Sequence, residues 1–171
     1  QYMKDMSPRS AGLILIAQPV MMTVFSPFAG RLSDRVEPRI VASLGMAISS
    51  LGLVLLACLN AGTALAFVVA SLAVLGFGFA LFSSPNTNAV MSSVDRRFYG
   101  VAASTLGTMR LVGQSLSMGI AMLIFGALVG RVQITAASQG NFLQAVRTGF
   151  IIFAALCFAG VFASLARGNR K

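Results

Sequence analysis

Five long apolar stretches divide the sequence, and they decide what the chain can fold into. They cover about residues 11–29, 40–59, 64–91, 101–130 and 145–166, with short polar segments between them. About 20 apolar residues of helix cross the hydrocarbon core of a bilayer. Only 10% of the residues are charged, against ~25% in a soluble domain. The sequence therefore predicts an all-α membrane protein, a single transmembrane domain built as a bundle of about five helices within a lipid bilayer.

The basic residues report orientation. The chain has a net charge of +9, but its Lys and Arg residues stand singly or in short groups between apolar stretches, and no basic face for nucleic acid is formed. Cytoplasmic loops carry the excess of Lys and Arg. The richer side carries Arg31, Arg35, Arg39, Arg96, Arg97, Arg167, Arg170 and Lys171, and the other carries Lys4, Arg9, Arg131 and Arg147. We expect the C-terminus to be cytoplasmic and the N-terminus external, so a preceding helix is expected to be missing.

The sequence lacks the combinations of residues that form catalytic or metal-binding sites. The sequence has no His, and Cys58 and Cys157 stand alone in apolar stretches. A lone Cys in such a stretch is typically a small buried hydrophobe. The sequence also contains no nucleophile–base pair and no phosphate-binding Gly-rich loop. We therefore predict neither a metal site, nor a cofactor, nor an enzyme.

The five stretches differ in their polar content. The second and fifth are almost wholly apolar, apart from small residues that permit close helix contact. The first, third and fourth contain polar side chains at depth, which in a bilayer face other helices or a water-filled cavity. These side chains are Gln18, Thr23, Asn86, Asn88, Thr108, Arg110, Gln114, Ser115 and Ser117. We expect the first, third and fourth spans to surround a cavity, with the other two outside against lipid.

The polar segment after the first span, residues 30–39, has two interpretations. Asp34 stands between Arg31 and Arg35 and could form a charge network at the membrane face. Its carboxylate could also bind the positive N-terminal end of a neighbouring helix, and the fourth span begins on the same side. Alternatively, the segment is a solvated loop that only fixes topology.

Two features of the spans suggest function, each with a simpler alternative. Pro85 removes a backbone donor and should kink the third span, either as a structural bend or as a bending point for alternating access. Arg110 is a charge within the fourth span, where insertion at mid-bilayer would cost roughly 2.5 to 3.5 kcal/mol. It either faces protein or water beside Gln114, or reaches the membrane interface with its long side chain.

The motif residues resemble a known family. The pattern Gly30-x-Leu32-x-Asp34-Arg35, followed by Arg39, resembles the cytoplasmic loop motif of the major facilitator superfamily. Residues 76–86 (GFGFALFSSPN), 100–104 (GVAAS) and 110–115 (RLVGQS) together are similar to the late helices of its fourteen-helix drug:proton antiporter branch. The resemblance implies part of the C-terminal half of the major-facilitator fold, matching the last five helices, with the N-terminal half of the transporter as a missing partner.

The resemblance also implies a function for the whole. It implies a proton-coupled exporter of drugs or other small amphipathic solutes in the cell membrane, with a gating motif at Gly30, Asp34, Arg35 and Arg39. Gln18, Asn86, Arg110 and Gln114 are the candidates for lining its cavity. The acidic residues Asp5, Asp34, Glu37 and Asp95 all lie outside the spans, so the resemblance places the proton site in the missing half. A stand-alone scaffold or regulatory subunit, and an uptake transporter of the same superfamily, are the alternatives.

Overall fold

The computed structural model describes residues 8–60, 62–130 and 139–165, and the elements in these ranges are all helical. Five spans in these ranges are long and apolar enough to cross a membrane. This confirms the predicted all-α membrane bundle. The elements are α1 (Pro8–Leu15), α2 (Ala17–Ser33), α3 (Pro38–Ala57), α4 (Leu65–Ser92), the short 3-10 helix η1 (Arg96–Phe98), α5 (Tyr99–Leu128) and α6 (Gln139–Leu165).

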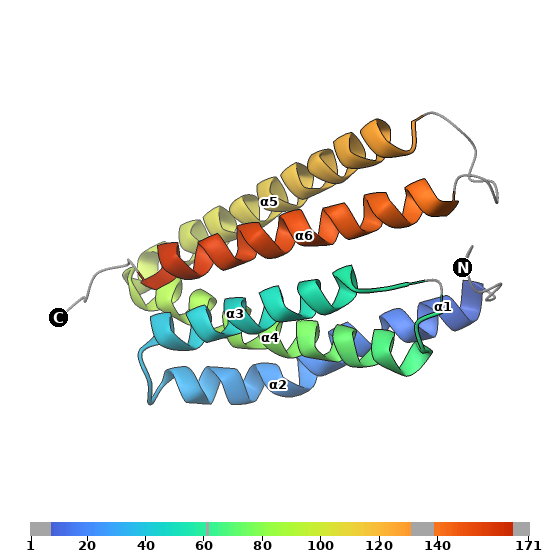
Figure 1. The fold of residues 1–171 in the computed structure, drawn as a ribbon. Coiled ribbons are helices and arrows are strands. Elements are labelled where there is room, and N and C mark those ends of the chain that lie inside the picture. The colour runs from blue at the N-terminus through green and yellow to red at the C-terminus, as the bar shows by residue number, and fades with distance from the viewer. Residues whose placement is uncertain (1–7, 61, 131–138, 166–171) are drawn as a thin grey trace.

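The spans run alternately up and down, so the connections fall at two opposite ends of the bundle (Figure 1). The α2–α3 and α4–α5 connections lie at the end where α6 finishes, and the α3–α4 connection lies at the end where α1 begins. Arg31, Arg35, Arg39, Arg96 and Arg97 therefore belong to one end, which we call the basic end, and Arg9 and Arg147 to the other. Lys4, Arg131, Arg167, Arg170 and Lys171, which the orientation argument also used, lie outside the described residues.

The helices pack in two rows. Helix α4 lies between α2 and α5 in the first row, and α3 and α6 form the second, with α3 packed on α4 and α6 on α5. The rows have the same members as the two predicted groups of spans. Helix α3 is the most buried span because α4 and α6 both cover it. An exposed apolar stripe remains on it at Ile40, Leu44, Leu51 and Val54, a surface suited to lipid.

Small residues mediate close contacts both between the rows, where α3 meets α4, and within the second row, where α3 meets α6. A Cβ atom on Gly45 of α3 would lie 2.5 Å from the backbone nitrogen of Phe82 and 2.8 Å from the carbonyl oxygen of Gly78. On the α6 side, the Ser43 hydroxyl donates to Ser164 Oγ at 2.8 Å and the Ser50 hydroxyl donates to the Ala154 carbonyl at 3.0 Å. Close backbone approach and serine hydrogen bonds are how helices associate in lipid.

Helix α5 is the least covered part of the bundle. It has no buried residue, and its side chains at Leu111, Leu116, Met118 and Leu123 are all more than half exposed. It reaches α6 through the Phe125 and Phe142 rings, whose centroids lie 5.6 Å apart, and it contacts α4 near its start.

Two helices extend beyond the predicted spans. Residues 30–33 continue α2 instead of opening a loop, because Arg31 suits the negative end of a helix and the Ser33 hydroxyl donates back to the Gly30 carbonyl at 2.7 Å. The last span begins at Gln139, six residues before the predicted start at Ala145, since Phe142 already packs on α5. The third span, Leu65–Ser92, agrees within one residue and is a continuous helix through Pro85.

The first span contains a break that hydropathy does not reveal. Helix α1 ends at Leu15 and α2 begins at Ala17, with Ile16 between them. Pro19 has no N–H, so the Leu15 carbonyl lacks its partner four residues on. The Ile16 carbonyl regains one from Val20 N–H at 3.1 Å, which lets the chain continue as α2.

Candidate functional site

The polar segment Ser83-Ser84-Pro85-Asn86-Thr87-Asn88 lies in the last third of α4, in an otherwise apolar helix. Pro85 is fully buried, and it leaves the Leu81 carbonyl without a helical donor. The Thr87 hydroxyl donates to the Ser83 carbonyl at 2.9 Å. The segment thus concentrates hydroxyl, amide and carbonyl groups on α4, the middle helix of the first row.

The end of α2 is attached to this segment. Gly30 lets α2 approach closely, because a Cβ there would lie 3.2 Å from Ser84 Oγ. Ser33 is buried, and its hydroxyl oxygen accepts a long hydrogen bond of 3.5 Å from Asn88 Nδ2. In the structure, Gly30 of the predicted gating motif is therefore a packing contact between α2 and α4.

Helix α5 reaches the segment through Arg110. Its Nη2 atom donates to Ser83 Oγ at 3.5 Å. Arg110 stands eleven residues after the first residue of α5, a rise of about 16 Å, so the contact lies well inside the helix. The side chain remains exposed. The structure thus shows a protein partner for Arg110.

Arg110 belongs to a stripe of small and polar residues on α5. Gly107, Arg110, Gln114 and Ser117 are spaced by three or four residues and so share one helical face, and all four are exposed. The Ser117 hydroxyl donates to the Gly113 carbonyl at 2.9 Å. Gln114 is therefore one turn beyond Arg110 on the same face, as the sequence predicts.

Gln18 lies in a different part of the bundle from Asn86. Its backbone carbonyl packs against Gly76 of α4, where a Cβ atom would have no room. Gly76 and Asn86 are ten residues apart in α4, or about 15 Å. Asn86 lies in the chain between Ser84 and Asn88, which approach Gly30 and Ser33 at the end of α2, whereas Gln18 lies near the α1–α2 break. Both side chains are partly buried.

The charged residues of the basic end are mostly solvated. Asp34 and Arg35 are exposed, and the expected network of Asp34 with Arg31 and Arg35 is absent from the residues described. Arg39 instead pairs with Glu37, and Arg97 pairs with Asp95 at 3.3 Å. Exposed ion pairs gain little in water, so nothing forces Asp34 into one. Helices α2 and α5 do not contact each other, and the latch role of the motif stays a prediction.

Sequence reasoning missed several of these residues. Ser33 and Ser83 hold the contacts to Asn88 and Arg110, yet neither stands out among the many serines of the chain. Arg147 was assigned only to topology, but its Nε donates to the Leu59 carbonyl at 3.1 Å and its Nη2 to Asn60 Oδ1 at 2.8 Å. The polar run that begins at Ser83 was the only feature of the sequence that pointed to contacts in this region.

Comparison with known proteins identifies the family. The family model described as Major Facilitator Superfamily matches residues 1–171. The chain belongs to the major facilitator superfamily. Its curated relatives are transporters and not enzymes. No solved structure is significantly similar to it.

Several curated transporters of this superfamily are similar to the chain. It is 26% identical to the riboflavin transporter RibZ of Clostridioides difficile over 94% of the chain and 35% of the relative. It is 30% identical to the uncharacterized transporter YebQ of Escherichia coli, over 88% of the chain and 31% of the relative. It is also 30% identical to the methyl viologen resistance protein SmvA of Salmonella typhimurium, over 77% and 26%. The chain thus spans about a third or less of these relatives.

Proposed function

We propose that the chain forms part of a proton-coupled exporter of amphipathic solutes, including drugs, in the cell membrane. The observation that supports this most is the polar segment of α4, which is joined to α2 through Ser33 and to α5 through Arg110. Connected polar groups inside a membrane bundle typically mark a solute or ion pathway. Similarity to a methyl viologen resistance protein favours export of foreign compounds.

In this proposal the first row faces a second helix bundle supplied by the rest of the transporter. Transport would proceed by rocking of the two bundles around a site between them. Asn86, Arg110 and Gln114 would contribute to that site from α4 and α5, with Gln18 nearer the opposite end. No Asp or Glu lies within a helix of the described part of the chain, so the proton-carrying carboxylate would belong to the second bundle.

The basic end would face the cytoplasm. Cytoplasmic loops carry more Lys and Arg than external ones, and within residues 8–60, 62–130 and 139–165 five Arg residues belong to this end against two at the other. The C-terminus would then also be cytoplasmic. Asp34, Arg35 and Arg39 would hold this end closed by contacts with the second bundle, because within the described chain Asp34 is exposed and the carboxylate is available.

The test uses the full transporter that contains this chain. Export of methyl viologen and of a fluorescent cationic dye is measured in cells, and the direction and proton dependence in inside-out vesicles. Asp34→Asn should lower export at equal protein level, while Asp95→Asn, which removes an exposed acid at the same end, should not. Unchanged export by Asp34→Asn would refute the latch, and proton-independent flux would refute the coupling.

Riboflavin transport is a second candidate. The riboflavin transporter RibZ is similar over 94% of the chain, a larger share than SmvA covers. Radiolabelled riboflavin in the same vesicles separates the two. Accumulation that competes with methyl viologen would indicate one broad site, whereas riboflavin flux without any drug export would replace the drug proposal.

A further inference from the structure

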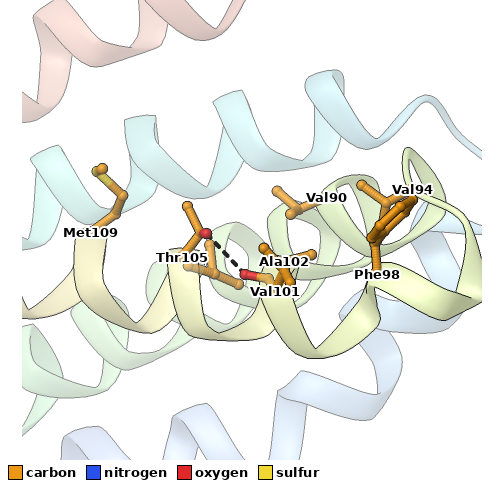
Figure 2. A pocket seen from close by; sticks show the side chains of 8 residues that line it. Val90, Val94, Phe98, Val101, Ala102, Thr105 and Met109 are labelled. Carbon is orange, nitrogen blue, oxygen red and sulfur yellow. Dashed lines mark hydrogen bonds between the residues drawn. The ribbon is translucent and has the colours of Figure 1, made fainter.

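An apolar groove of about 470 Å³ lies where α4 ends and α5 begins. Figure 2 shows the side chains that line it, which come from both helices and from η1 between them. The apolar lining includes Val90, Val94, Phe98, Val101, Leu106 and Met109. Thr105 contributes the one hydroxyl of the lining, and that group already donates to the Val101 carbonyl at 2.8 Å. The groove therefore suits a hydrocarbon ligand.

The groove has the depth of one membrane leaflet. On the side formed by η1 and α5, the lining runs from Phe98 to Met109, eleven residues apart, which corresponds to about 16 Å of helix. The hydrocarbon core of a bilayer is about 30 Å thick, so one leaflet accounts for about half of it. A lipid whose headgroup lies at the level of Phe98 would place its acyl chain along the whole groove.

The end of the groove at Phe98, which belongs to the basic end of the bundle, carries positive charge. The Arg97 guanidinium lies over the Phe98 ring, 4.8 Å from its centroid, and Arg96 precedes it in an exposed position. Asp95 pairs with Arg97 at 3.3 Å, but both side chains are more than 70% exposed, so the pair is weak and screened. Two guanidinium groups against one carboxylate leave this rim net positive.

We propose that this groove holds one acyl chain of an anionic phospholipid, whose phosphate lies against Arg96 and Arg97. The depth of the groove matches the length of an acyl chain, its apolar lining suits the hydrocarbon, and its basic rim suits the anionic headgroup. Clusters of basic residues next to membrane helices are known to attract anionic headgroups. This site is separate from the polar contacts of Ser83 with Arg110, and it does not depend on the solute or on the direction of transport.

The experiment counts lipids bound to the intact transporter that contains this chain. The detergent-purified protein is incubated with phosphatidylglycerol or phosphatidylcholine, and bound lipid is measured by native mass spectrometry. A double Arg96→Gln, Arg97→Gln variant should reduce the preference for phosphatidylglycerol by roughly 5-fold per Arg removed. The charge-matched control Arg31→Gln, Arg35→Gln at the same end should keep the preference.

A second pair of variants tests the groove itself. Thr105→Phe places a ring in the groove, and Thr108→Phe adds the same ring at an exposed site of α5 outside the lining. Lipid retention should fall in the first variant and persist in the second. Wild-type protein with a phosphatidylglycerol that carries a photoreactive acyl chain should be labelled within residues 90–109.

Three results would overturn the proposal. Equal loss of lipid preference in the two double Arg variants would mean general surface charge. Equal retention in the two Phe variants, or photolabel only outside residues 90–109, would place the lipid elsewhere. Cross-linking of a Met109→Cys variant to another part of the transporter, with no lipid label, would show that protein covers the groove.

Discussion

The close contact between α3 and α4 gives a stability prediction with a known direction. In Gly45→Ala the new methyl group would lie 2.5 Å from the Phe82 nitrogen, 2.7 Å from the Leu81 carbonyl carbon and 2.8 Å from the Gly78 oxygen. All three are backbone atoms, so no side chain can rotate away and the helices must separate. Overpacking of this kind typically costs about 1–3 kcal/mol, and we expect a loss of unfolding free energy in the upper part of that range.

The control is Gly113→Ala on α5, where an added Cβ meets nothing within 4 Å. Replacing Gly by Ala within a helix favours the helix by up to about 1 kcal/mol, so this variant should be neutral or slightly stabilised. Unfolding free energies are measured by steric trapping of the full transporter in the same micelles. If the two variants differ by less than about 0.5 kcal/mol, a difference expected of ordinary surface changes, the close α3–α4 packing is refuted.

Three further predictions follow from single contacts. Arg147→Ala removes two hydrogen bonds to the connection between α3 and α4 and should lower the unfolding free energy by about 1 kcal/mol or more, measured by the same trapping assay, with Arg147→Lys recovering only part. Arg110→Gln should lower transport more than it lowers stability, whereas Ser83→Ala should have a small effect on both, because the bond between them is long; vesicle flux and steric trapping separate these effects. Gly30→Ala should be slightly destabilising, since its Cβ meets only Ser84 Oγ at 3.2 Å, and combining it with Ser84→Ala should restore stability.

The spans could be predicted because the bilayer imposes one simple condition on them: a helix that crosses it needs about 20 mainly apolar residues. Residues 64–91 were expected and Leu65–Ser92 is found, since this stretch is apolar over most of its length, despite the polar segment 83–88, and polar residues flank it on both sides. The condition fails where a helix extends beyond the membrane core. The last turn of α2 and the first turns of α6 are polar, and local contacts of Ser33 and Phe142 keep them helical.

The partners of the polar residues could not be predicted in the same way. Hydropathy shows that Arg110 and Asn88 are unusual in their spans, but not which helix each one faces. Arg147 and Asn60 are 87 residues apart in sequence, and their contact depends on α6 packing against α3. Such pairs follow from the rotation of each helix about its axis, which small residues such as Gly45 and Gly78 determine through backbone contact.

The exposure of α5 limits what can surround it. Its stripe of Gly107, Arg110, Gln114 and Ser117 is uncovered in the described chain, although an Arg facing lipid at this depth is costly. Arg110 has one long hydrogen bond to Ser83, which satisfies only one of its five N–H donors. Lipid can cover the apolar groove between α4 and α5, but it offers no acceptors to this stripe. The proposed second bundle would supply them, and a carboxylate there would serve both Arg110 and the proton.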